Sequence, residues 1–379
     1  MHPAVALVPG FFGFDHRESQ TYFADRFIAG LRAGLEARGV CDVPVVAVST
    51  LGIASMWKRQ KELLTELRAL ETPSKKSPRL GGPRRWHLVG HSTGGVDAAL
   101  LLREHPLMDG GKHSVVAQGG WSEWSDLIER VRSVTTISAP HFGTALAESA
   151  LARWSAGHPS LAALRDAAHA ALDVARRGDL RSRVSFMFSA MPKVSQTPLF
   201  LLQILFQDEL ARDLHPKVMG EIGRSPFRLG AQARTFSIAT VSPRPARDHD
   251  DKLFRDMWRW THEAASRVAP PPIEPSWLDD ASLRLSSQRH VELAPIDDGD
   301  NDGVVSTTRQ VVGKAIALVV GDHVDVLGRY KRTSLVDGKA VDPGLLPSGA
   351  DFGDDDFFAL MDRIAARLAE SIRADAASG

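Results

Sequence analysis

Short apolar runs alternate along the chain with longer segments in which apolar residues recur at helical spacing. The apolar runs fall at residues 4–8, 43–48, 86–90, 133–138, 234–240 and 315–320. Their length and their content of valine, isoleucine and threonine are typical of core strands. Strands that alternate with helices pair in parallel, so the pattern predicts an α/β protein with a mostly parallel, doubly wound sheet of about six core strands.

Segments with helical periodicity follow or separate these runs. Phe23, Phe27, Leu31 and Leu35 recur at a spacing of four residues, and Gly39 ends that helix. Further helices are predicted over residues 60–70, 96–102, about 122–132 and 161–175, and from Asp354 through Leu368.

Two stretches without strand character divide the predicted sheet into parts. We expect residues 1–143 to form the first part of the core, 144–233 a helical cap or lid insertion, and 234–379 the second part. The second part is itself interrupted at about 242–296. Within the cap, residues 198–206 form a nearly continuous apolar segment. Two interpretations stay open for this segment: a buried core helix, or the lining or lid of a ligand pocket.

Composition narrows the class of protein. The 46 lysines and arginines balance 46 aspartates and glutamates, which gives no reason to expect nucleic acid as a partner. Cys41 is the single cysteine, so no intrachain disulfide can form. No transmembrane run is present, and residues 1–10 are more typical of a core strand than of a signal peptide. We therefore expect a cytoplasmic protein, or a secreted one if the chain has been trimmed.

The clearest chemical pattern lies at the carboxyl end of the third predicted strand. Gly90-His91-Ser92-Thr93-Gly94 follows an apolar run and precedes a helix. This is the G-x-S-x-G nucleophile elbow in its strand–turn–helix setting. The tight turn raises the serine hydroxyl above the sheet, near a helix N-terminus. A serine that only caps the helix is the alternative, but the partners described next favour Ser92 as a nucleophile.

A nucleophilic serine needs an imidazole base that is itself held by a carboxylate. In sites of this kind, the chain order is serine, acid, histidine. Of the 14 histidines, only His323 directly follows a strand and also follows an acidic loop that comes after an earlier strand. His323 is therefore the predicted base. His141 precedes every candidate acid, and we expect it to pack or to form hydrogen bonds near the pocket.

The acidic loop at 297–303 supplies the predicted acid. Asp302 is the preferred residue, and Asp300 is the alternative. The same loop matches the first half of a calcium-binding EF-hand. However, the position that needs a bidentate glutamate is Arg309, and no helices flank the loop, so we reject that interpretation.

An oxyanion hole needs two backbone N–H donors. One comes from the residue after the nucleophile and one from the first strand–helix loop. These positions are Thr93 and Phe11, and Gly10 permits the loop conformation that would aim the Phe11 amide inward. A plain strand–helix turn is the alternative for Phe11.

Several segments, in this order, resemble the bacterial triacylglycerol lipases (true lipases) of the α/β-hydrolase superfamily. They are Pro9 to Asp15, Gly90 to Gly95, Ser138 to Thr144, Asn301 to Ser306 and His323 to Asp325. Proline at position 9 replaces the histidine of the family's oxyanion loop. The matches lie between residues 5 and 327, and the two insertions show no resemblance. The resemblance implies an α/β-hydrolase fold with a compact six-strand core.

The resemblance also implies features that this chain only partly matches. Members of the family are typically secreted and often carry one disulfide, for which this sequence lacks the cysteines. They also bind a structural calcium ion through the aspartate two residues after the catalytic histidine. Asp325 occupies that position, and Asp279 is a candidate second ligand. We expect no required cofactor, with a structural calcium ion as the only candidate.

The expected activity is hydrolysis of carboxylic esters through an acyl-enzyme, on acylglycerols or other lipophilic esters. A polyhydroxyalkanoate depolymerase, a short-chain esterase or an acyltransferase would share the same triad, and an inactive hydrolase-fold binding protein is the non-enzyme alternative. If residues 198–206 line an acyl pocket or form a lid that opens at a lipid surface, charging Leu201, Leu202 and Leu205 will shift the preference from long-chain to short-chain esters.

Overall fold

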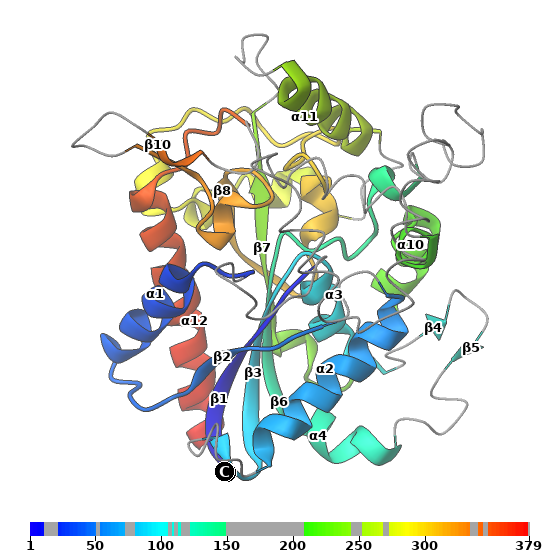
Figure 1. Ribbon diagram of the computed structural model, residues 1–379, viewed down its shortest axis with the longest axis vertical. Coiled ribbons are helices and arrows are strands. Elements are labelled where there is room, and N and C mark those ends of the chain that lie inside the picture. The colour runs from blue at the N-terminus through cyan, green and yellow to red at the C-terminus, as the bar shows by residue number, and fades with distance from the viewer. Residues whose placement is uncertain are drawn as a thin grey trace, which may run out of the picture.

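The computed structural model describes residues 1–10, 22–50, 54–72, 80–104, 108–109, 113–114, 122–148, 208–243, 252–267, 273–333, 340–343 and 348–377. Six strands form one parallel sheet at its centre, in the order β2-β1-β3-β6-β7-β8 (Figure 1). They are β1 (His2–Val8), β2 (Val45–Ala47), β3 (Arg84–His91), β6 (Val131–Ile137), β7 (Thr235–Val241) and β8 (Lys314–Val320). The predicted α/β class and parallel sheet are confirmed.

Both faces of the sheet are buried, which explains why its strands are apolar runs rather than alternating ones. Successive side chains of a strand point to opposite faces. In β1, Val5 and Leu7 join one hydrophobic cluster, whereas Ala4, Ala6 and Val8 join another on the other side.

Helices cover each of these faces (Figure 1). The face of Val5 and Leu7 packs against α1 (Asp25–Glu36) and α12 (Asp354–Ala377). The other face packs against α2 (Met56–Glu71), α3 (Thr93–Leu100) and the short α4 (Ser125–Glu129). The helices predicted from periodicity at the two ends of the chain are confirmed.

The helix predicted at about 122–132 is too long and needs correction. Residues Ser122–Trp124 form a 3-10 turn, α4 ends at Glu129, and β6 already begins at Val131. Val131 is buried and pairs with Trp86 of β3. Burial of this β-branched side chain in the sheet extends the strand by two residues beyond its predicted start.

The two insertions are helical where the structure describes them. In the first, residues 208–233 contain α9 (Asp208–Asp213), α10 (Pro216–Gly223) and the start of η4 (Gln232–Arg234). The predicted helix at 161–175 and the apolar segment 198–206 lie outside the described residues. The proposed domain boundaries stay a prediction.

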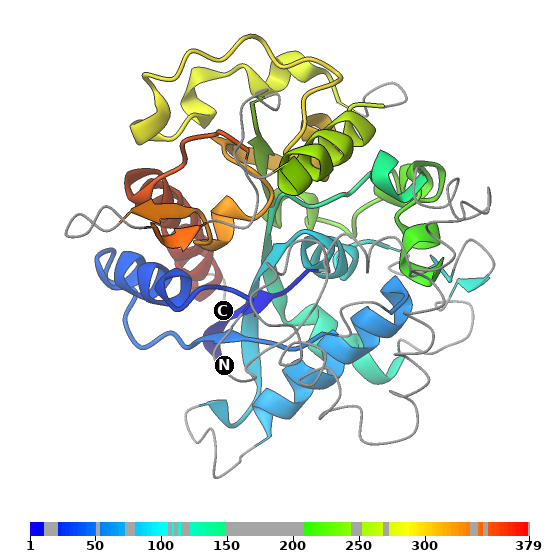
Figure 2. The same cartoon turned by 45° about the horizontal axis from the view of Figure 1, so that its top comes forward.

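The second insertion reaches beyond the carboxyl ends of the strands with residues 252–265, at the edge that Figure 2 turns forward, and runs beside β8 with residues 281–288, where Arg284 pairs with Leu318. It contains α11 (Lys252–Ala265) and three 3-10 turns, η5 (Pro275–Leu278), η6 (Ala281–Leu283) and η7 (Ser286–Gln288). Two further 3-10 turns, η8 (Thr307–Gln310) and η9 (Asp325–Leu327), flank β8.

Two short antiparallel pairs were not predicted, because strands of two to four residues are too short to show alternation. They are β4 (Met108–Asp109) with β5 (His113–Ser114), and β9 (Lys331–Thr333) with β10 (Ala340–Pro343). None of the helices in the described part of the chain has the length and apolar character needed to cross a membrane.

Candidate active site

Ser92 lies on a sharp turn between β3 and α3. Its backbone has φ 53° and ψ −131°, a conformation that a residue with a side chain rarely adopts. Close packing on either side requires the glycines of the elbow. A Cβ on Gly90 would lie 2.5 Å from the carbonyl oxygen of Gly94, and one on Gly94 would lie 2.3 Å from that of Val8. The strained turn that the sequence predicts is therefore present.

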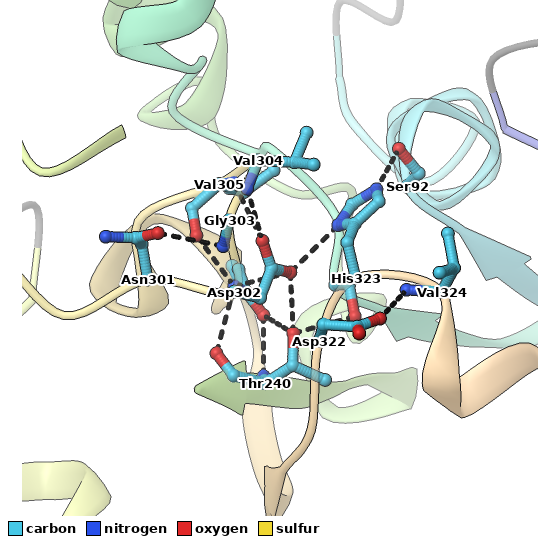
Figure 3. A network of polar contacts seen from close by, with 12 residues as sticks. Ser92, Thr240, Asn301, Asp302, Gly303, Val304, Val305, Asp322, His323 and Val324 are labelled. Atoms are coloured by element: carbon cyan, nitrogen blue, oxygen red, sulfur yellow. Dashed lines mark hydrogen bonds and ion pairs between the residues drawn. The ribbon is translucent and has the colours of Figure 1, made fainter. Parts of the chain in front are cut away.

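The structure brings Ser92, His323 and Asp302 together in one hydrogen-bonded row (Figure 3). Nε2 of His323 lies 2.9 Å from Oγ of Ser92, and its Nδ1 lies 2.8 Å from Oδ2 of Asp302. The three residues come from loops that follow β3, β7 and β8, so the carboxyl edge of the sheet assembles them. All three are buried, with Ser92 6% and His323 2% exposed.

The Asp302 carboxylate is surrounded by donors on both oxygens (Figure 3). Oδ1 accepts from the amides of Val304 at 3.0 Å and Val305 at 2.8 Å. Oδ2, the oxygen that contacts His323, also accepts from Thr240 Oγ1 at 2.7 Å and Gln310 Nε2 at 3.2 Å. These bonds replace the water that a buried charge loses, and they fix the carboxylate facing the imidazole.

Asp300, the alternative acid, has a different environment. Its Oδ2 accepts from the backbone amide of Asp297 at 2.9 Å and so closes the acidic loop upon itself. The described contacts of His323 include Asp302 and not Asp300.

The structure describes one of the two residues that are predicted to donate to the oxyanion. Thr93 is the first residue of α3, so its amide is one of the N–H groups that lack an acceptor within the helix. Phe11 lies outside the described residues. Gly10, just before it, lies against the nucleophile, because a Cβ there would be 2.7 Å from Cβ of Ser92.

A buried ion pair supports the start of this first loop. The guanidinium of Arg59, on α2, contacts Oδ2 of Asp97, on α3, at 2.7 Å, and both side chains are fully buried. Arg59 also donates to the carbonyl oxygens of Pro9 at 3.2 Å and Gly10 at 3.4 Å. Burial raises the pKa of Asp97 to about 6, although the neighbouring Arg59 opposes this shift.

His141 does not contact Ser92 or Asp302 in the described structure. Its Nε2 lies 3.0 Å from the hydroxyl of Thr136, and burial lowers its pKa to about 3. It is a neutral, hydrogen-bonded core histidine.

Asp279 and Asp325, the two candidate calcium ligands, lie in different environments. Asp279 is exposed, and its Oδ1 accepts from the amide of Ile296 at 2.9 Å. Asp325 is buried, and its Oδ2 accepts from the amide of Asp322 at 2.9 Å. The described residues contain no group of three metal-ligating side chains from His, Cys, Asp and Glu. A calcium ion held by Asp279 and Asp325 stays a prediction.

Sequence reasoning missed several residues around the site. Thr240 is the last residue of the predicted strand 234–240 and the next-to-last residue of β7, and a polar residue at the carboxyl end of a predicted strand could have drawn attention to it. Arg59 lies one residue before the predicted helix 60–70, but on the buried face of the longer α2, which is an unusual position for an arginine. Gln310 and Tyr22 carry no comparable pattern in the sequence.

No protein-family model and no curated protein matches the sequence. Among solved structures, the chain is similar to the lipase of Staphylococcus hyicus, with 16% identity and a TM-score of 0.52 over 99% of this chain and 97% of that one. It also aligns with lipase 1 of Pelosinus fermentans (17% identity, TM-score 0.46, 97% and 98% covered) and with EstA of Clostridium botulinum (17%, 0.47, 96% and 88%). At such identities, the likeness concerns the fold.

The parallel six-stranded sheet with helices on both faces, together with the likeness to the Staphylococcus hyicus structure, defines an α/β-hydrolase fold. The fold expected from the resemblance to bacterial lipases is confirmed. The elbow after β3 and the histidine after β8 occupy the strand ends at which such sheets carry their sites.

Proposed function

We propose that this protein is a serine hydrolase that cleaves carboxylic esters through an acyl-enzyme. Ser92 is the nucleophile, His323 the general base and Asp302 the acid that orients it. The amides of Thr93 and Phe11 form the oxyanion hole. The observation that carries the proposal is the imidazole of His323, which bridges Ser92 Oγ and Asp302 Oδ2 at 2.9 and 2.8 Å.

The direction of each hydrogen bond follows from the chemistry of the partners. A carboxylate can only accept, so Nδ1 of His323 carries its proton toward Asp302, and Nε2 is free to accept from the hydroxyl of Ser92. As the hydroxyl oxygen attacks the ester carbonyl carbon, its proton moves to Nε2, and the imidazolium forms beside Asp302. That proton then goes to the leaving alcohol.

Deacylation repeats these steps with water. His323 takes a proton from a water molecule, whose oxygen attacks the acyl carbon. The bond between that carbon and Ser92 Oγ then breaks, His323 returns the proton to Oγ, and the carboxylic acid leaves. The negative charge that develops in each addition lies at the N-terminus of α3, where the helix dipole and the Thr93 amide favour it.

Lipophilic esters, acylglycerols among them, are the proposed substrate class. Support comes from the motifs that resemble those of bacterial lipases and from the likeness in fold to the Staphylococcus hyicus lipase. Contact with a lipid surface through residues 198–206 is part of the same proposal. Rates on p-nitrophenyl esters of increasing chain length, triglyceride and polyhydroxyalkanoate will separate a lipase from a short-chain esterase or a polyester depolymerase. The ratio of acid to transesterified product with an added alcohol will identify an acyltransferase.

Labelling by a fluorophosphonate is the decisive test of the chemistry. We expect the wild-type protein to be labelled on the peptide that contains Ser92 and Ser92→Ala to be unlabelled. Circular dichroism on both proteins controls for folding. Absence of label on folded wild-type protein would contradict the proposal and favour the inactive binding protein.

A further inference from the structure

His91 directly precedes Ser92 in the elbow, yet the proposed steps give it no role. Its side chain is buried, and its ring packs against that of His323 with centroids 4.8 Å apart. Nε2 of His91 lies 2.7 Å from the backbone carbonyl oxygen of His323. Its Nδ1 lies 2.6 Å from the hydroxyl of Tyr22.

The partners of His91 determine its tautomer. A carbonyl oxygen can only accept, so Nε2 of His91 carries the proton and donates to His323. Nδ1 must then accept, and the hydroxyl of Tyr22 is its donor. Burial, reinforced by the neighbouring His323, holds the pKa of His91 well below the usual histidine value, so the neutral form that this arrangement needs is the favoured one.

Tyr22 extends these hydrogen bonds to the first loop. Its oxygen accepts from the backbone amide of Gly10, and a Cβ on Gly10 would lie 2.5 Å from that oxygen. The hydrogen bonds thus all point in one direction. The Gly10 amide donates to Tyr22, Tyr22 donates to His91, and His91 donates to the carbonyl oxygen of His323. Each donor among these residues therefore faces an acceptor.

These contacts hold the main chain of His323 from one side. On the other side, the amide of His323 donates to the carbonyl oxygen of Asp302 at 3.1 Å. Because hydrogen bonds fix both the N–H and the C=O of His323, its main chain sets the position of the side chain. The two hydrogen bonds of the imidazole, to Ser92 and Asp302, then set the orientation of the ring. Displacement of a reacting group by about 1 Å is enough to cost about 100-fold in rate.

We propose that His91 and Tyr22 are positioning residues for the base: the hydrogen bond from His91 to the His323 carbonyl keeps the imidazole between Ser92 and Asp302. Tyr22 locks the tautomer of His91 that can make this bond. The inference rests on the proposed function, because it assigns a role in the activation of Ser92.

The test compares His91→Leu, which removes the donor, with His91→Gln, whose amide nitrogen sits at nearly the same distance from the backbone as Nε2. We expect His91→Leu to lower both kcat on a p-nitrophenyl ester and the rate of fluorophosphonate labelling by about 10- to 100-fold, with KM unchanged. His91→Gln should recover most of both rates. Tyr22→Phe should lose about two- to tenfold in both, because His91 is then free to carry its proton on Nδ1.

His87→Leu is the matched control. His87 lies on the same strand, is equally buried and bonds Ser133 Oγ at 2.8 Å, away from the three residues of the site. We expect this variant to lose stability and yet to label at the wild-type rate. Nitrogen NMR of the wild type should show the His91 proton on Nε2.

The outcomes separate this inference from the proposed function. If folded wild-type protein does not label, the proposed function fails, and the inference fails with it. If the wild type labels and folded His91→Leu labels equally fast, only the positioning role is overturned. Should His91→Leu not fold, an unchanged labelling rate in Tyr22→Phe, or a His91 proton on Nδ1 in the wild type, overturns it.

Discussion

The hydroxyl of Thr240 lies 2.7 Å from Oδ2 of Asp302, the same carboxylate oxygen that contacts His323. Thr240 is the next-to-last residue of β7, whereas Asp302 lies in the loop before β8, so a strand end and a loop of the neighbouring strand share one carboxylate oxygen. This relationship places the Asp302 carboxylate among hydrogen-bond donors that hold it facing the imidazole of His323.

Asp302→Asn is expected to lower kcat by about 10⁴-fold while leaving the fold intact. The amide side chain no longer holds His323 in the tautomer that accepts the Ser92 proton, a loss of the size known for a serine protease triad. The measurement is kcat on a p-nitrophenyl ester. Asp300→Asn is the matched control in the same loop, and it should keep most of the activity. Equal losses in the two variants would contradict the assignment of Asp302.

Thr240→Val is expected to reduce the free energy of unfolding by about 1.5–3 kcal/mol, because it removes a hydrogen bond to a buried charged group. Thr240→Ser retains the hydroxyl and should recover much of this loss. Urea denaturation of both variants measures the difference. If the two variants were equally stable, the hydroxyl would have no part in holding Asp302.

Arg59→Met is expected to destabilise the protein by about 3–5 kcal/mol, because it leaves Asp97 as a buried charge without its partner. The double variant Arg59→Met with Asp97→Leu should recover much of that stability. Activity should stay low in the double variant, since the carbonyls of Pro9 and Gly10 still lack their donor. Urea unfolding and kcat measured on the same samples provide the test. Recovery of full activity would show that Arg59 supports stability alone.

Buried histidines are expected to make the protein less stable in acid. Burial lowers the pKa of His87 to about 4 and that of His141 to about 3. Between about pH 6.5 and these values, the unfolded chain binds protons at these sites and the folded chain does not. The contribution of these histidines to the free energy of unfolding is therefore complete above about pH 6.5. It decreases as the pH falls, by up to about 1.4 kcal/mol per pH unit for each histidine.

His141→Gln isolates one of these contributions. Buried carboxyl groups with raised pKa values, such as Asp97 and Asp322, have the opposite sign: their contribution is lost as the pH rises through about 6. They are present in both proteins and cancel in the comparison. Urea unfolding at several values between pH 4.5 and 7.5 should show a shallower dependence in the variant. Parallel curves would mean that His141 takes up its proton at the same pH in the folded and the unfolded protein, which contradicts a lowered pKa.

Much of the fold and part of the site could be predicted from the sequence, because they depend on local chemistry. Apolar runs of strand length locate the core strands, and the glycines around Ser92 specify the tight turn. The position of His323 after the last predicted strand singled it out among the histidines. Each of these features is a property of a few consecutive residues, or of their order along the chain.

Tertiary structure decided which groups meet. Asp300 and Asp302 are two residues apart and carry the same side chain, and only the backbone of the folded loop turns one toward His323 and the other toward Asp297. Tyr22 reaches His91 across 69 positions of the chain, and His91 reaches the His323 carbonyl across 232. A hydrogen bond needs its donor and acceptor within about 3 Å and aligned, and for residues so far apart in the chain that geometry exists only once the sheet and its helices have packed.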